Sequence, residues 1–360
     1  MSGYPAPASE RSWGNPQPTL QDLAPEAALR KLELIVTRRL DGLLNGDYPG
    51  LLPGPGTELA EARIYEPGTD DVRRMDWNVT ARTTVPHVRD MVADRELETW
   101  ALVDGTASMD FGTGRVEKRD LAVAAVAAVG FITARAGNRL GALVTGDHRG
   151  RGGLYRFPAR AGRGPLLTLL HALLTAPRMP PGTPAGSLAE AIVAMDRSVR
   201  RRGLVVVVSD FLDGLGDAGT AFPAPAPSWE RPLHRLALRH QVVAVEVYDP
   251  RELDLPDVGV LTVVDPETGR RREVATASTR LRERYAAAAA EQRATIRESL
   301  RRSGIPRLAL RTDGDWLRDI VEHVEIQRRL AGAPPVAPPV ADPVTGPVTG
   351  PVPGTPGGRP

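Results

Sequence analysis

The stretch that decides the fold is GLVVVVSD (203–210), in which an unbroken apolar run leads into a serine and an aspartate. A continuous apolar run of this length predicts a strand that is buried on both faces of a sheet. Similar strands are predicted at 99–103, 139–145, 242–248 and 307–310, and helices at 117–136, 163–175, 187–202, 229–240, 278–303 and 315–330. Strands that alternate with helices predict a mostly parallel sheet covered on both faces, and right-handed crossovers make it a doubly wound α/β fold of Rossmann type.

The rest of the chain divides around this α/β domain, which we place at 96–331. Residues 20–95 contain a predicted helix (21–44) and short extended pieces near 62–65 and 85–92. Residues 1–19 are polar and contain prolines, and 332–360 are rich in Pro, Gly, Val and Thr, with VTGP at 344–347 repeated at 348–351. Segments of this composition bury too little apolar surface to fold, so both ends are predicted to be disordered.

Composition narrows the function classes. The chain has 46 Lys and Arg against 44 Asp and Glu, a net charge of +2, so no strong field favours nucleic acid. Its cations are almost all arginine, since Lys31 and Lys118 are the only lysines. The absence of cysteine excludes disulfides, thiolate zinc sites and a cysteine nucleophile. The longest uncharged apolar stretch, 121–134, is shorter than the roughly 18 residues of a membrane span, and no export signal is apparent, so we expect a cytoplasmic protein.

Two predicted strands end in acidic turns, DGTAS (104–108) and SD (209–210). In a sheet of order 3-2-1-4-5, with 139–157 forming strands two and three as a hairpin, the first and fourth strands are neighbours. Asp104 and Asp210 then lie side by side at the carboxyl ends of the strands, where α/β folds bind their ligands. Two carboxylates with the hydroxyls of Thr106 and Ser108 suit a hard cation such as Mg²⁺, with Mn²⁺ or no metal as alternatives.

A further hydroxyl for such a site could come from Thr183 or Ser187, between which the sequence does not choose. The structural alternative is that these residues are ordinary turn and capping residues, with Ser187 as a helix N-cap.

These motifs carry a family resemblance. The D-x-T-x-S motif followed by a distant Ser-Asp is similar to the metal-ion-dependent adhesion site (MIDAS) of von Willebrand factor A-like domains. The segment YEPGTDDVRRMDWNVTAR (65–82) resembles the signature of domain-of-unknown-function family 58 (DUF58), and 86–96, SMDFG (108–112) and DPETG (265–269) also fit it. The resemblance covers roughly 40 to 330.

The resemblance implies a von Willebrand factor A-like fold and a function as an adaptor for a MoxR-type AAA+ ATPase and its protein client. It implies metal ligation by Asp104, Thr106, Ser108 and Asp210, with Thr183 or Ser187 as the loop hydroxyl. Thr106 stands where the family usually has serine. Many members carry two membrane helices ahead of this region, and we expect none here.

The 65–82 segment could form a partner-facing surface, made of Asp70, Arg73, Arg74, Asp76, Trp77 and Arg82. The interpretation that we favour is structural: Trp77 and Tyr65 pack this arm against the sheet.

Three function classes remain. A non-enzymatic interaction protein is the first. A metal-dependent hydrolase or phosphate enzyme using the same acidic residues is the alternative. Against the alternative, the nucleophile position of haloacid-dehalogenase-type phosphatases holds Leu102, and neither a G-x-S-x-G elbow nor a P-loop occurs. The near-neutral charge disfavours the third class, a nucleic-acid-binding module.

Overall fold

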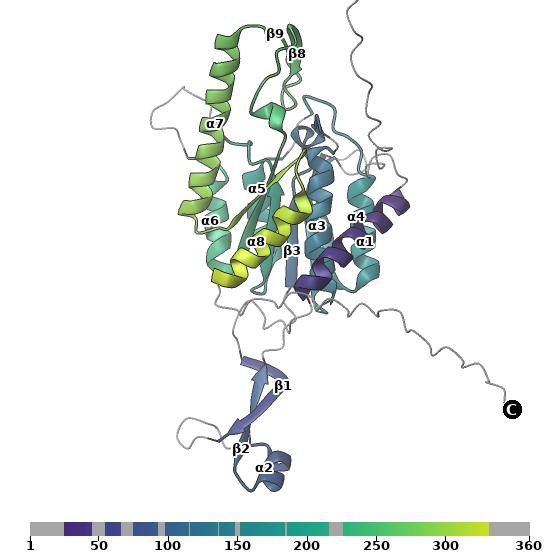
Figure 1. Ribbon diagram of the computed structural model, residues 1–360, viewed down its shortest axis with the longest axis vertical. Helices are drawn as coiled ribbons and strands as arrows, with labels where there is room; N and C mark the ends of the chain where they lie inside the picture. The colour runs from purple at the N-terminus through teal and green to yellow at the C-terminus, as the bar shows by residue number, and fades with distance from the viewer. Residues whose placement is uncertain are drawn as a thin grey trace, which may run out of the picture.

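A six-stranded sheet in the order β10-β7-β6-β3-β4-β5 forms the centre of the described chain (Figure 1). The computed structural model describes residues 25–44, 55–65, 75–92, 98–114, 116–135, 137–147, 152–183, 186–215 and 226–330. The strands of the sheet are β3 (Glu98–Val103), β4 (Arg139–Asp147), β5 (Gly152–Ala161), β6 (Leu204–Ser209), β7 (Gln241–Tyr248) and β10 (Arg307–Arg311). All neighbouring pairs are parallel except β4 and β5, which form an antiparallel hairpin at one edge.

This strand order confirms the predicted doubly wound α/β fold: starting from β3, the chain adds β4 and β5 on one side and then β6, β7 and β10 on the other. The first and fourth strands of the sheet, β3 and β6, are neighbours, and Val103 pairs with Val208 in their register. The order contains the predicted 3-2-1-4-5 arrangement, with the predicted hairpin as β4 and β5 and with β10 added beyond β7.

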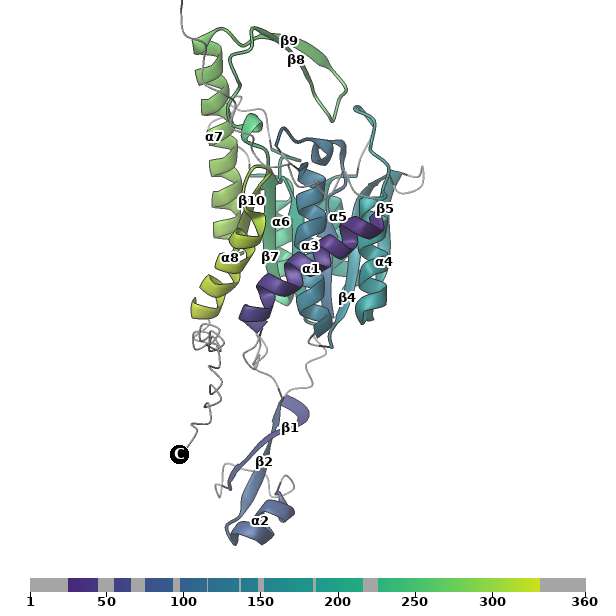
Figure 2. The same ribbon diagram turned by 45° about the vertical axis from the view of Figure 1, so that its right-hand side comes forward.

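Helices cover both faces of the sheet (Figures 1 and 2). On one face lie α1 (Pro25–Leu44), α3 (Lys118–Arg135), α4 (Arg163–Leu174) and α8 (Trp316–Leu330). On the other lie α5 (Leu188–Ser198), α6 (Glu230–Arg239) and α7 (Thr279–Arg302). Successive strand residues alternate between the two cores: in β6, Val206 and Val208 face the first and Val205 and Val207 the second. The unbroken run of valines is therefore buried on both sides, as predicted.

Helix α1 belongs with the α/β body. Leu29, Leu32 and Val36 of α1 are buried in the same core as α3 and α4. The physical reason is that α3 is apolar on nearly every side, so it needs a layer outside it as well as the sheet beneath it. The sequence-based division, which groups this helix with the 65–82 arm in 20–95, thus differs from the packing.

The arm consists of an antiparallel pair, β1 (Pro55–Ile64) and β2 (His87–Val92), with the short helix α2 (Trp77–Thr83) beside it. Both views show these elements apart from the six-stranded sheet (Figures 1 and 2). A second small unit is the antiparallel hairpin of β8 (Val260–Val264) and β9 (Arg271–Ala275), whose turn contains the DPETG segment (265–269). Two short 3-10 turns, η2 (Ala107–Asp110) and η3 (Pro250–Glu252), follow β3 and β7.

The segments predicted to be disordered, 1–19 and 332–360, lie outside the described residues. Within the described chain, no helix combines the length and the apolar character needed to cross a membrane.

Candidate functional site

The candidate site lies where β3 and β6 end side by side. The backbone N–H of Asp104 donates to the carbonyl of Val208 at 2.9 Å, which continues the parallel ladder by one step. Asp104 follows β3 and Asp210 follows β6, and both side chains are almost completely buried. The prediction that the fold brings these two carboxylates together is therefore borne out by the strand register. We call Asp104, Thr106, Ser108, Lys118, Ser209 and Asp210 the edge cluster.

The carboxylate of Asp104 accepts four hydrogen bonds. Its Oδ1 accepts from the backbone N–H of Thr106 at 3.1 Å, from Thr106 Oγ1 at 2.8 Å and from Thr145 Oγ1 at 3.3 Å. Its Oδ2 accepts from Ser209 Oγ at 2.6 Å. These donors come from the ends of β3, β4 and β6, so Asp104 ties three adjacent strands together.

The two hydroxyls of the D-x-T-x-S turn lie in the same cluster. Thr106 Oγ1 and Ser108 Oγ are 3.1 Å apart, and both side chains are buried. The Ser108 hydroxyl also hydrogen-bonds the carboxylate of Asp210. Thr106 and Ser108 therefore link the two aspartates.

A lysine neutralises Asp210. Lys118 is the first residue of α3, its side chain is completely buried, and its Nζ donates to Asp210 Oδ2 at 2.8 Å. The same Nζ donates to Glu252 Oε1 at 2.5 Å. The other oxygen of Asp210, Oδ1, accepts from the backbone N–H of Leu212 at 3.0 Å. Both carboxylate oxygens of Asp210 thus have donors from the protein.

The ionic contacts continue across the sheet from Glu252. Arg293 of α7 donates to Glu252 Oε2 at 3.2 Å and to Glu246 Oε1 at 2.5 Å. Glu246, which is fully buried, also pairs with Arg307 of β10. Charges of alternating sign therefore run from Asp210 to the far strand of the sheet.

The electrostatics of the two aspartates differ. Burial, reinforced by the nearby charge of Asp210, raises the pKa of Asp104. Burial also works against the charged form of Asp210, but the Lys118 ammonium outweighs it and lowers the pKa of Asp210. Burial disfavours the Lys118 ammonium too, yet the Asp210 and Glu252 carboxylates prevail and raise its pKa. We therefore treat Asp210 and Lys118 as a charged pair.

The backbone turn after Asp210 is held by the core. Phe211 has a φ of 58°, in the left-handed region, although it is not glycine. Its ring packs edge-on against Trp229 with the centroids 5.3 Å apart, and Trp229 Nε1 donates to the Phe211 carbonyl at 3.3 Å. This packing fixes the direction in which the backbone continues after Asp210 at the end of β6.

The two candidate loop hydroxyls make their hydrogen bonds elsewhere. Thr183 Oγ1 donates to the carbonyl of Pro180 at 2.7 Å, within its own turn. Ser187 Oγ accepts from the backbone N–H of Glu190 at 3.1 Å and caps α5 in a capping box. The capping alternative for Ser187 is thus confirmed, and the hydrogen bonds of both residues stay within their own turns rather than reaching the edge cluster.

The side chains of the edge cluster, as they are arranged, do not fit a divalent cation. The oxygens of Asp104 and Asp210 point at donors of the protein, and one of those donors already carries a positive charge. Among the described residues, no three His, Asp or Glu side chains gather in a way that could hold a metal. The set of metal ligands that the sequence predicted is therefore assembled only in part.

The β8–β9 hairpin reaches toward this end of the sheet. The carbonyl of Pro266, in its turn, accepts from the backbone N–H of Gly182 at 2.9 Å. Partial burial raises the pKa of Glu267 in the same turn, and the charges of Asp104 and Asp210 add to the effect. The hairpin turn therefore lies within electrostatic range of the edge cluster.

The arm residues divide into three groups. Asp70, Arg73 and Arg74 lie outside the described residues. Asp76 is buried, and its Oδ1 accepts from the backbone N–H of Val79 at 3.2 Å at the start of α2. Trp77 is 65% exposed, and Arg82 is exposed. The expectation that Trp77 packs against the sheet is wrong, because the arm that carries it stands apart from the body.

Sequence reasoning missed part of the edge cluster. Thr145, which lies outside the cluster and bonds Asp104, was also missed, because a single hydroxyl in a strand is too common to mark a site. Lys118 had a signal in the composition, since it is one of only two lysines in a chain whose other cations are arginine. Nothing in the spacing connects it with Asp210, because the two are far apart in sequence.

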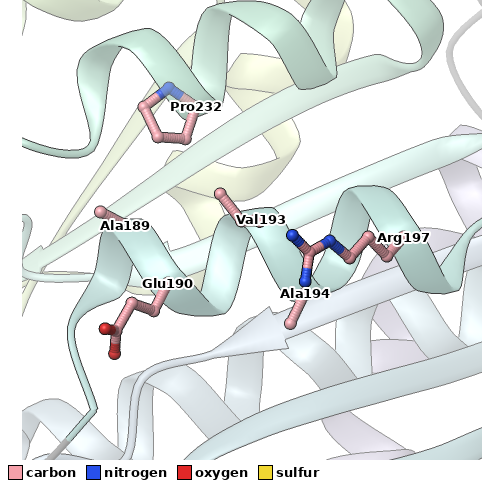
Figure 3. Close-up of a pocket in the computed structure, with 6 residues that line it drawn as sticks. All are labelled: Ala189, Glu190, Val193, Ala194, Arg197 and Pro232. Atoms are coloured by element: carbon pink, nitrogen blue, oxygen red, sulfur yellow. The ribbon is translucent and has the colours of Figure 1, made fainter.

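A separate shallow groove lies between α5 and α6 (Figure 3). Its volume is about 370 Å³, and its lining is mostly apolar. The lining residues are Ala189, Glu190, Val193, Ala194, Arg197 and Pro232. None of them belongs to the edge cluster, so the groove is a different feature of the surface.

Known proteins are similar to this chain over most of its length. The family model described as "Protein of unknown function DUF58" matches residues 61–295. An uncharacterized protein of Mycobacterium tuberculosis (strain ATCC 25618 / H37Rv) is 52% identical over 308 residues, which are 85% of this chain and 91% of that protein. An uncharacterized protein of Mycobacterium avium is 46% identical over 181 residues, covering 50% of this chain and 99% of that protein.

Among solved structures, the conserved hypothetical protein BatB from Bacteroides thetaiotaomicron aligns with a TM-score of 0.37 and 14% identity. That alignment covers 65% of this chain and 99% of BatB.

Proposed function

We propose that the chain, which belongs to the DUF58 family, is a non-enzymatic protein–protein interaction protein that works as an adaptor in the cytoplasm. The proposed partner is a MoxR-type AAA+ ATPase, and the adaptor would link it to a protein client. This choice of partner follows from the family resemblance of the 65–82 segment.

The observation that supports an interaction role best is the exposure of Trp77. A tryptophan side chain buries a large apolar area when it is covered, so leaving it 65% exposed on a short helix is unfavourable unless a partner covers it. Arg82 lies on the same helix, and Trp and Arg are the residues most enriched at the energetic centres of protein interfaces. We therefore propose α2 as the partner-facing surface.

In the version of this proposal that the sequence favours, an acidic side chain of the partner is held through Mg²⁺ at Asp104 and Asp210. The arrangement of the edge cluster does not support that version. The α2 surface needs no metal, and we base the proposal on it.

The test is a binding measurement between the purified full chain and the MoxR-type ATPase of the same genome, with and without ATP. Trp77→Ala should weaken the complex by about 30-fold, which corresponds to the roughly 2 kcal/mol of an interface hot spot. The matched control is Leu238→Ala, because Leu238 on α6 is 73% exposed and lies in the α/β body. Equal affinities of the wild type and Trp77→Ala, or the absence of any complex, would refute the proposal.

The alternative function is a metal-dependent hydrolase or phosphate enzyme. Because Asp104 and Asp210 lie at neighbouring strand ends, one assay tests this alternative. Hydrolysis of p-nitrophenyl phosphate with Mg²⁺ or Mn²⁺ would be measured for the wild type and for Asp104→Asn. Turnover that the substitution abolishes would favour the enzyme over the adaptor.

A further inference from the structure

We propose that the ammonium group of Lys118 takes the place of the divalent cation at the edge cluster, which is therefore a metal-free form of the adhesion-type site. This inference concerns the chemistry of the cluster and does not rest on the proposed adaptor role.

The position of Lys118 Nζ is the first argument. The side chain is completely buried and bridges two carboxylates, with 2.8 Å to Asp210 Oδ2 and 2.5 Å to Glu252 Oε1. Asp210 is the same carboxylate that the D-x-T-x-S resemblance assigns to the metal. A buried ammonium on that oxygen supplies the positive charge that a metal would bring.

The location of Lys118 on α3 is the second argument. It is the first residue of the helix, where the helix dipole disfavours a cation. Burial of a lysine also carries a large desolvation cost. Both effects oppose the arrangement, so the attraction of the two carboxylates must be what holds the ammonium there.

The balance of charge is the third argument. The chain of ion pairs runs Asp210, Lys118, Glu252, Arg293, Glu246 and Arg307, with the sign alternating at every step. Acidic and basic members are equal in number, so these groups are neutral together without a metal. A divalent cation added at Asp210 would leave these groups with excess positive charge even when the carboxylate of Asp104 is counted with them.

The saturation of Asp104 is the fourth argument. Its carboxylate accepts four hydrogen bonds, from Thr106, Thr145 and Ser209. These hydrogen-bond donors stabilise the buried carboxylate of Asp104, as a bound cation would in a metal site. The edge cluster is thus complete as it stands, and a partner's carboxylate has no metal to bind.

The first experiment titrates Mn²⁺ into the purified full chain and follows free Mn²⁺ by electron paramagnetic resonance, with calorimetry for Mg²⁺. The wild type should bind neither ion at concentrations up to about 10 mM, well above those that fill ordinary weak cation sites. Binding of one equivalent that Asp104→Asn or Asp210→Asn abolishes would overturn the inference.

In the same titration, Lys118→Ala should gain a Mn²⁺ site that a second substitution, Asp210→Asn, removes. The control is Lys31→Ala, the same change at the chain's other lysine, which should gain none. If Lys118→Ala gains no site, the ammonium does not stand in the position of the cation.

The second experiment is a double-substitution cycle in urea unfolding at fixed pH. Lys118→Met should lower the unfolding midpoint strongly, and Asp210→Asn in the same chain should restore part of the loss, because it removes the carboxylate left without its cation. If Lys118→Met is insoluble, a soluble Lys118→Met/Asp210→Asn chain shows the same recovery. Additive effects would overturn the inference, and the wild-type metal titration decides independently of any variant.

Discussion

Replacing Asp104 tests whether this residue acts as a hydrogen-bond acceptor or as a buried charge. Asp104→Ala removes the acceptor of four hydrogen bonds, whereas Asp104→Asn keeps Oδ1 and replaces Oδ2 by an amide nitrogen. The two variants have different consequences for the three strands that meet at this residue, and their difference can be calculated from the contacts.

In Asp104→Ala, two close donors are left without an acceptor. The Thr106 backbone N–H cannot turn away, and the Ser209 hydroxyl loses its 2.6 Å contact. The Thr106 hydroxyl can donate to Ser108 Oγ at 3.1 Å, and the Thr145 hydroxyl is left out of the count because its 3.3 Å contact with Asp104 is the longest of the four. Since a buried group without a partner costs about 1–3 kcal/mol, we expect a loss of about 2–6 kcal/mol in the free energy of unfolding.

Asp104→Asn should lower the free energy of unfolding far less, by no more than about 1 kcal/mol, because Oδ1 still accepts and the Ser209 hydroxyl can rotate to accept from the amide.

The pH dependence of the stability gives a second test of Asp104. Because the pKa of Asp104 is raised above 3.8 in the folded state, its carboxylate stabilises the unfolded state as the pH rises. The stability of Asp104→Asn relative to the wild type should therefore increase as the pH rises above about 4.

Urea unfolding followed by tryptophan fluorescence measures these differences, since Trp100 and Trp229 are buried in the core. The reasoning is refuted if Asp104→Ala is as stable as the wild type, or if Asp104→Asn is as damaging as Asp104→Ala. The first result would mean that the four hydrogen bonds contribute nothing, and the second that the charge matters more than they do.

Two further predictions concern the fold around the site. His240 is buried, neither ring nitrogen has a hydrogen-bond partner among the described residues, and burial followed by the charge of Arg239 lowers its pKa from 6.5. Because the unfolded state takes up a proton more readily than the folded state, the wild type should lose stability relative to His240→Leu as the pH falls below 6.5. The loss should be at most about 1.4 kcal/mol per pH unit. Urea unfolding at a series of pH values measures it. Gly105→Ala should lower the free energy of unfolding by about 1–3 kcal/mol, because the added Cβ would lie 2.4 Å from the Thr145 carbonyl oxygen. Gly164→Ala in α4 should raise it by about 0.5 kcal/mol, because nothing lies within 4 Å of the added Cβ. Thermal unfolding of the two variants measures this contrast.

The central sheet could be predicted from the sequence because its signal is local. The valine run of β6 is apolar at every position, which requires burial on both faces, and the handedness of the crossovers then leaves few strand orders. The packing of α1 could not be assigned in the same way. Its apolar stripe shows that it must bury one face, but only the all-round apolar surface of α3 decides where.

The part of the candidate site that lies directly at the ends of the strands could be predicted from the sequence. Asp104 and Asp210 were placed together by topology alone, and Thr106 and Ser108 follow from their spacing to Asp104. The exposure of Trp77 could not be predicted, since an aromatic residue in a short segment is compatible with core or surface. The ionic partners of Asp210 could not be predicted either, because Lys118, Glu252 and Arg293 come from three separate elements.

The position of Lys118 shows how a buried pair of aspartates can be given a positive charge without a metal. Two aspartates at neighbouring strand ends require positive charge, and the sequence around them offers none within the turns. The helix that follows β3 begins at the same end of the sheet, so its first residue lies within reach of Asp210. A lysine there is opposed by the helix dipole and by burial, and two carboxylates together outweigh both. The fold can therefore supply this positive charge with a side chain or with a metal, and the Mn²⁺ titration of the wild type and of Lys118→Ala distinguishes the two.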